Sequence, residues 1–244
     1  MGGGPSVTAD SAGVAPDDPR GIERTATGAA IGLAAGVVGL ALPVGLVLLQ
    51  TYSPGTVFLT GVELVEATAL FALVGALLFA GSLILFRIGF AALRKFDPRF
   101  WVASVLCMLG TVGVILLLIP IGLAAASSTS LVSCVRGAPS RALGCLSSVA
   151  PLAADWGMVA FWLLWLGGLG IVVGVGLAGV RYRQGWFYGG AALYALLLLG
   201  LLGPALGLLF PIGALEYPLL AAPFLVLAAP AMILRGSRRT LVPS

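Results

Sequence analysis

A chain of 244 residues in which 60% are hydrophobic and only 9% are charged is not an ordinary water-soluble protein, because soluble domains carry about a quarter of their residues as charges. A mean hydropathy of +1.12 indicates a chain that lives in a lipid bilayer. The sequence has no His and no Asn, which excludes a His-based metal site, a Ser-His-Asp triad and a Cys-His dyad. Composition therefore favours an integral membrane protein without a metal or cofactor.

Residues 1–20 hold turn formers and acids but no apolar run, so we expect a disordered cytoplasmic tail there. A helix rises about 1.5 Å per residue, so roughly 20 residues cross a hydrocarbon core of about 30 Å. We predict an all-α polytopic bundle over 21–235, an external loop at 126–155 and a basic cytoplasmic tail at 236–244. Its six transmembrane helices are expected near 26–49, 62–86, 101–125, 156–180, 186–210 and 218–234.

The basic residues alternate in density between successive connections, which predicts the orientation of the chain. Only Arg136 and Arg141 fall in the connections on one side. The other 11 of the 13 Lys and Arg residues fall on the opposite side. We therefore expect both termini in the cytoplasm of a cell whose plasma membrane the chain crosses six times.

Small residues recur at a spacing of four in several of these segments. They are Gly28, Gly32 and Gly36 in the first segment, and Gly170 and Gly174 in the fourth. Such a spacing places small residues on one helix face and lets two backbones approach closely in lipid. Packing inside the bundle is the favoured interpretation, and a seam between copies of the chain is the alternative.

Acidic residues at membrane depth mark ion or proton sites in many membrane proteins. Glu63 and Glu66 lie three residues apart near the outer end of the second segment, on one helix face. They form a candidate ion or proton site. The alternative is a pair of ordinary carboxylates, which are favourable at a helix N-terminus.

Proline interrupts the fifth and sixth segments at Pro204, Pro223 and Pro230. A proline inside a helix frees a carbonyl group and kinks the helix. Broken helices of this kind can line the substrate site of a transporter, although bent helices with a purely structural role fit the sequence as well.

The expected external loop contains Cys134 and Cys145. A disulfide between them is plausible because this side of the membrane is the oxidising one. It would stabilise the loop by about 2–3 kcal/mol in the loop-entropy model.

Three short runs resemble a known family. Arg87-Ile-Gly-Phe-Ala-Ala-Leu closes the second segment, Arg20-Gly21-Ile22 precedes the first, and Arg181-Tyr182-Arg183 leads into Gly189-Gly190. Together they resemble an archaeal multi-pass membrane family called domain of unknown function 973, over roughly 20–218. The resemblance implies a helical membrane fold and no established activity, so it transfers no catalytic residues.

The sequence favours a non-enzymatic membrane protein that acts as an accessory or scaffold subunit of a membrane complex, or as a homo-oligomer. Its expected partners are the lipid bilayer and other membrane subunits or copies of itself. Nucleic acid is not expected, because a net charge of +4 is spread over several segments. The alternative is a small transporter or channel for a cation or small solute, using Glu63, Glu66 and the proline-broken segments five and six.

Overall fold

The computed structural model describes residues 19–52, 61–135, 151–206 and 216–241. All regular structure within these ranges is helical. The helices are α1 (Pro19–Gly36), the π-helical segment η1 (Val37–Ala41), α2 (Leu42–Tyr52), α3 (Gly61–Leu93), α4 (Phe100–Ala126), α5 (Ser128–Val135), α7 (Pro151–Tyr182), α8 (Gly185–Leu206) and α9 (Glu216–Leu241).

Four of these helices are long and apolar enough to cross a bilayer. They cover Pro19–Leu46, Val62–Leu93, Phe100–Leu123 and Asp155–Tyr182, whereas Gly185–Gly200 forms a shorter apolar helix. The helical membrane fold is therefore confirmed. Helices overlap all six predicted segments, but only four meet the criteria of length and composition.

Several element boundaries differ from the prediction. α5 and the start of α7 occupy parts of the expected loop at 126–155, and α9 runs to Leu241, through most of the expected tail at 236–244. The expected tail at 1–20 lies outside the described residues except for Pro19 and Arg20, which begin α1. Polar residues can extend a helix beyond the apolar segment because the water phase tolerates them, so hydropathy alone underestimates helix length.

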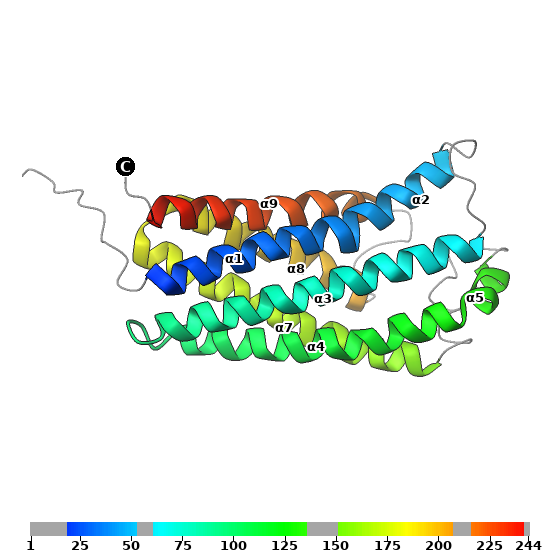
Figure 1. Cartoon of the computed structure of the whole chain (residues 1–244), viewed down its shortest axis with the longest axis horizontal. Helices are drawn as coiled ribbons and strands as arrows, with labels where there is room; N and C mark the ends of the chain where they lie inside the picture. The colour runs from blue at the N-terminus through cyan, green and yellow to red at the C-terminus, as the bar shows by residue number, and fades with distance from the viewer. Residues whose placement is uncertain (1–18, 53–60, 136–150, 207–215, 242–244) are drawn as a thin grey trace, which may run out of the picture.

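The helices run side by side (Figure 1), and their contacts close into a ring. Each of α1, α3, α4, α7 and α8 contacts the next in this order, α8 contacts α9, and α9 returns to contact α1. A two-residue turn makes α7 and α8 antiparallel, and in it Arg183 adopts a left-handed backbone conformation (φ 49°). The ring thus joins the first and last helices of the chain.

The ring brings the basic residues to one end of the bundle, which we call the basic end. The starts of α1, α4 and α8 and the ends of α3, α7 and α9 meet there (Figure 1). These termini carry every Lys and Arg among the described residues: Arg20, Arg24, Arg87, Arg94, Lys95, Arg99, Arg181, Arg183, Arg235, Arg238 and Arg239.

Aromatic rings hold several of these cations at the basic end. The guanidinium carbon of Arg235 lies 4.3 Å from the centre of the Trp186 ring, and that of Arg239 lies 5.5 Å from the same centre. Arg181 lies 5.5 Å from the Phe96 ring centre. Such cation–π contacts are typical of the interface between hydrocarbon and water, where the ring lies in apolar surroundings and the charge reaches water.

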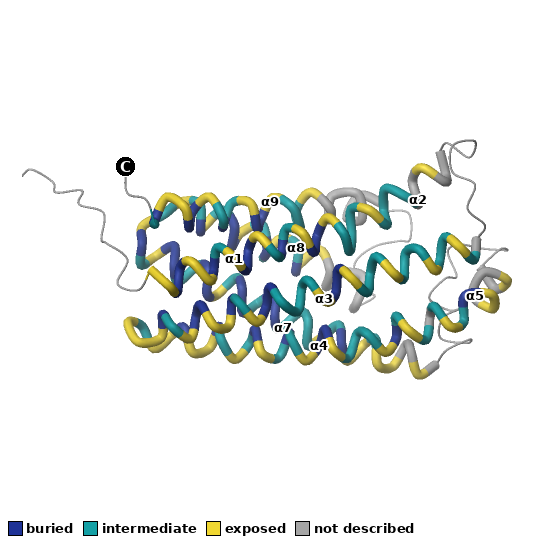
Figure 2. Tube along the Cα trace, viewed as in Figure 1, coloured by how far each residue is buried: buried dark blue, intermediate teal, exposed yellow. Residues whose placement is uncertain are grey.

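The tightest core lies in the half of the bundle next to the basic end, where buried positions gather (Figure 2). Phe86, Phe90 and Phe100 stack there with ring centres 5.7 and 6.0 Å apart. We call these three residues the aromatic cluster. All three side chains are fully buried.

Candidate functional site

Glu63 and Glu66 lie on the first two turns of α3, at the end of the bundle opposite the basic end, and both are exposed. The Ser128 hydroxyl of α5 donates a hydrogen bond to Glu66 Oε1 over 3.4 Å. Glu66 therefore links α3 to the short helix α5. This contact gives the carboxylate a role in attaching α5.

The two carboxylates do not reach the interior of the ring. The interior cavity described next begins on α3 at Ala72, six residues beyond Glu66, which is about 9 Å along the helix. Neither Glu63 nor Glu66 lines that cavity. The structure thus separates the candidate ion site from the cavity.

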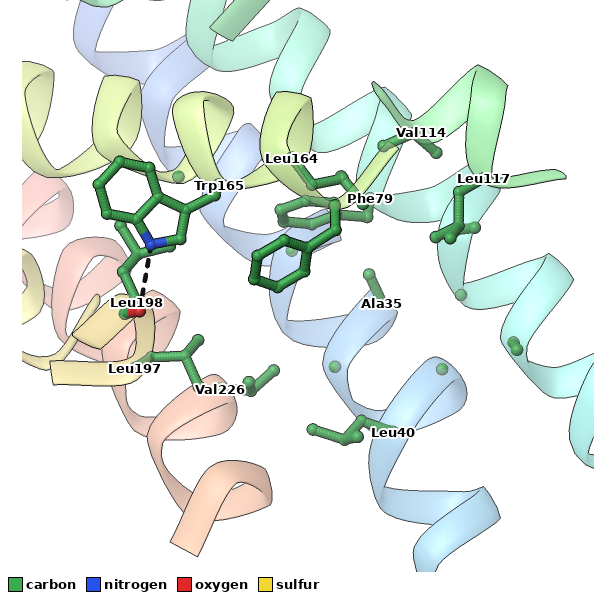
Figure 3. A pocket seen from close by; sticks show the side chains of 18 of the residues that line it. Ala35, Leu40, Phe79, Val114, Leu117, Leu164, Trp165, Leu197, Leu198 and Val226 are labelled. Atoms are coloured by element: carbon green, nitrogen blue, oxygen red, sulfur yellow. Dashed lines mark hydrogen bonds between the residues drawn. The ribbon is translucent and has the colours of Figure 1, made fainter. Parts of the chain in front are cut away.

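A cavity of about 370 Å³ lies inside the ring and is lined by residues of η1 and of the six helices α1, α3, α4, α7, α8 and α9 (Figure 3). Its lining is almost wholly apolar. The lining residues are Gly32, Ala35, Gly36, Gly39, Leu40, Ala72, Gly75, Ala76, Phe79, Val114, Leu117, Ile121, Phe161, Leu164, Trp165, Gly168, Tyr194, Leu197, Leu198 and Val226.

Small residues beside large ones create this space. Ala35, Ala72 and Ala76 of α1 and α3 contribute only methyl groups, while Phe79 and Trp165 contribute rings from α3 and α7 (Figure 3). Mixed packing of this kind leaves room that bulkier side chains at the alanine positions would fill.

The π-helical segment η1 lies along the same cavity, which Gly39 and Leu40 line. Gly39 rests directly on Gly75 of α3, since a Cβ at Gly39 would lie 2.9 Å from the Gly75 Cα. π-Helical turns inside α-helices often occur at functional sites. Here the segment lets the first helix touch α3 at a pair of glycines beside the cavity.

The polar groups around the cavity differ in their partners. Trp165 Nε1 donates a hydrogen bond to the Leu198 carbonyl oxygen over 3.1 Å and so ties α7 to α8 (Figure 3). Ser82 Oγ donates to the Gly28 carbonyl oxygen over 2.7 Å and ties α3 to α1. Tyr194 is 5% exposed, and its hydroxyl oxygen lies 3.8 Å from the position of a Cβ at Gly32.

The predicted small-residue faces lie inside the ring. A Cβ at Gly28 would lie 3.3 Å from Leu85 of α3, and one at Gly32 would lie 2.9 Å from Ser82 Oγ. Gly36 faces Val226 of α9. These positions leave the three glycines of α1 in contact with neighbouring helices of the same chain.

The same is true of the face on α7. A Cβ at Gly170 would lie 2.8 Å from the Cys107 backbone nitrogen of α4, and Gly174 faces the ring of Phe90. Cys107 is itself buried at this contact. Gly170 therefore contacts α4, and Gly174, one turn further along α7, contacts the aromatic cluster.

The expected disulfide falls on residues that the structure describes only in part. Cys134 lies in α5, and Cys145 lies outside the described residues. The bond between them stays a prediction. Within 19–52, 61–135, 151–206 and 216–241, no group of three or more His, Cys, Asp or Glu residues is placed to hold a metal ion.

The cavity is the feature that the sequence did not reveal. The alanines and glycines that leave its space are distributed over α1, η1, α3 and α7, and the rings that bound it come from α3, α7 and α8. A signal exists in the alternation of small and aromatic residues within α3, where Ala72, Ala76 and Phe79 share one face. That signal identifies a cavity only once the neighbouring helices are known.

Comparison of the chain with models of known protein families, with curated proteins and with solved structures finds no match.

Proposed function

We propose that the chain is a six-span integral protein of the plasma membrane with both termini in the cytoplasm. The gathering of the described basic residues at the basic end supports this orientation, because Lys and Arg are enriched on the cytoplasmic side. The short helix α8 would cross together with α9, as the parity of the chain requires. The resemblance to the archaeal family stays a prediction.

We further propose that the protein is not an enzyme and acts as an accessory or scaffold subunit that contacts other membrane subunits or copies of itself. Its buried Ser and Thr hydroxyls support a structural role. Thr25, Ser82, Ser237 and Thr240 each donate to a backbone carbonyl oxygen, and Ser128 donates to Glu66. Ser82 and Ser128 thus link different helices, and the other three hydroxyls are satisfied within their own helix.

The outer surface of α7 is the contact face that we propose. Met158 and Trp162 lie four residues apart and therefore on one helix face, both are exposed, with Met158 at 51%, and we call them the α7 outer face. Trp and Met are enriched where protein surfaces meet, and Met adapts its shape to a partner. Phe161 and Trp162 meet edge to face at 5.6 Å, as do Trp162 and Trp165 at 6.3 Å, so packed rings support this face from within.

A photo-crosslinking amino acid at position 158 tests the contact in native membranes. The same amino acid at Leu196 of α8, which is 55% exposed, serves as the matched control. We expect a discrete polypeptide adduct from position 158 and only lipid adducts from position 196. Native mass spectrometry in mild detergent then tells a foreign subunit from a second copy, and the absence of any polypeptide adduct at position 158 would refute the proposal.

A second candidate, a small transporter, is favoured by one observation, the cavity inside the ring. If Glu66 carried a proton or cation, Glu66→Gln would abolish pH-dependent flux into proteoliposomes. Glu66 lies away from the cavity and accepts a hydrogen bond from Ser128. We therefore expect no pH-dependent flux in the original protein or in the Glu66→Gln variant. A flux that is present in the original chain and lost in the variant would establish the transporter instead.

A further inference from the structure

The cavity has the size and chemistry of a ligand site. Its volume of about 370 Å³ lies within the range of roughly 300–1,000 Å³ that is usual for small-molecule sites. None of the residues that line it is charged. Apolar cavities of this kind remain dry and accept apolar molecules.

Tyr194 is the exception in this apolar lining. It is buried to 95% and lines the cavity, with its hydroxyl beside Gly32, another lining residue. The hydroxyl makes no hydrogen bond within the described residues, and it is not among the fully enclosed atoms there that lack a partner, which leaves its oxygen open to the cavity that Tyr194 lines. A buried Tyr hydroxyl normally has a partner, because leaving it without one costs free energy.

We propose that the cavity binds one neutral lipid-like molecule that carries a carbonyl oxygen and accepts a hydrogen bond from Tyr194. The molecule is neutral because an ion at this depth in the membrane would have no compensating charge in the lining. Its hydrocarbon part lies along Leu40, Leu117 and Ile121, toward the end opposite the basic end. This inference goes beyond the accessory role and does not depend on it.

The position of Tyr194 sets the orientation of the bound lipid-like molecule in the cavity. Gly32 and Tyr194 mark the inner limit of the cavity, and Phe86 of the aromatic cluster follows one helical turn after Ser82, which faces Gly32. A longer molecule therefore cannot extend toward the basic end. The carbonyl group of the bound molecule therefore lies at this inner limit, and its hydrocarbon chain lies farther from the basic end.

Fluorescence of Trp165, which lines the cavity, gives a direct measurement. In a variant that keeps Trp165 as its one tryptophan, a bromine-bearing long-chain methyl ketone and a bromoalkane of equal length are titrated, since bromine quenches an indole that it contacts. We expect both to quench, and the ketone to bind about fivefold more tightly through one neutral hydrogen bond. Equal affinity of the two probes would refute the role of the hydroxyl.

Two variants separate the contribution of the Tyr194 hydroxyl to binding from that of the cavity volume. Tyr194→Phe keeps the ring and should remove the preference for the ketone while the bromoalkane binds as before. Ala72→Phe fills the cavity and should abolish quenching by both probes, whereas Leu70→Phe, at a position 60% exposed on the same helix, should change nothing. An unchanged ketone preference in Tyr194→Phe overturns the proposal even where Ala72→Phe fails to fold.

The lipid that stays bound to the protein through mild purification identifies which natural molecule supplies the carbonyl group. Mass spectrometry of an organic extract distinguishes a quinone with an isoprenoid tail from an acyl ester. We expect one such molecule per chain in the original protein and loss of it in Ala72→Phe but not in Leu70→Phe. Equal amounts in all three proteins would show that the lipid is bound elsewhere and would overturn the proposal.

Discussion

A close approach between α4 and α7 depends on two glycines that face each other. Gly110 of α4 and Gly167 of α7 are so close that a Cβ at Gly167 would lie 2.5 Å from the Gly110 Cα. In lipid, packing of this kind replaces the hydrophobic drive that holds helices together in water. Any side chain at either position has to push the two backbones apart.

We therefore expect Gly167→Ala to destabilise the protein by about 1–3 kcal/mol, as overpacking does in tightly packed cores. Gly176 lies on the same helix, and a Cβ there would meet nothing within 4 Å, so Gly176→Ala is the matched control. We expect the control to be neutral or slightly stabilising, because Ala favours the helix. Thermal unfolding in detergent measures both variants, and equal midpoints would contradict the role of the contact.

At this scale the sequence predicted the type of residue but not all of the positions. It singled out Gly28 and Gly170, which do lie between helices, but it missed the Gly39–Gly75 and Gly110–Gly167 pairs. A motif within one segment shows which residues share a face. A pair across two helices also requires their relative depth, which one segment does not contain.

At the scale of the elements, a side-chain hydrogen bond joins α1 to α3. Ser82 Oγ donates to the Gly28 carbonyl oxygen over 2.7 Å, and Ser82 is fully buried. The bond lies beside the contacts of Gly28 and Gly32 with α3, where the two backbones run close together. It fixes the depth at which the two helices meet.

Ser82→Ala should lower stability by about 0.6–1.7 kcal/mol, the range measured for hydrogen bonds between transmembrane helices. The control is Ser237→Ala, because the Ser237 hydroxyl is equally buried but bonds to Ile233 of its own helix. We expect a smaller effect from the control. Chemical denaturation in mixed micelles compares the two, and a larger loss for Ser237→Ala would contradict this assignment.

The apolar segments predicted the helices, because a run of about 20 apolar residues has few other ways to satisfy its backbone in lipid. The π-helical segment η1 was not predicted, since Val37–Ala41 carries no local signal that differs from the helix around it. Its position beside Gly75 points to a tertiary cause. α5 was also missed, because Ser and Thr dominate its sequence and favour turns when considered alone.

At the scale of the whole molecule, the helix ends that the charge pattern assigns to the cytoplasm lie together at the basic end of the bundle. We expect Leu152→Cys, at the start of α7, to react with a membrane-impermeant maleimide added to intact cells expressing an otherwise cysteine-free protein. Lys95→Cys, between α3 and α4, should react only after the cells are permeabilised. Both positions are exposed, so access to the reagent is the variable. Labelling of Lys95→Cys in intact cells would show that the chain has the opposite orientation.

The cavity could not be predicted at this scale from the sequence, because it depends on how six elements close around one space. The position of Val226 on α9 opposite Gly36 on α1, for example, depends on the closure of the ring. Charge and hydropathy predict the direction of each crossing, but they do not determine which helices become neighbours.

The contact between α1 and α9 has a consequence for the order in which the chain is made. Ribosomes deliver the N-terminal helix first, yet Gly36 meets Val226 only after almost the whole chain has been synthesised. During that interval α1 already has α3 beside it but still lacks its other neighbour. A nascent chain that stalls before α9 therefore leaves a glycine-lined flank of its oldest helix open to the surrounding membrane, where quality-control proteases and chaperones can recognise an unfinished molecule.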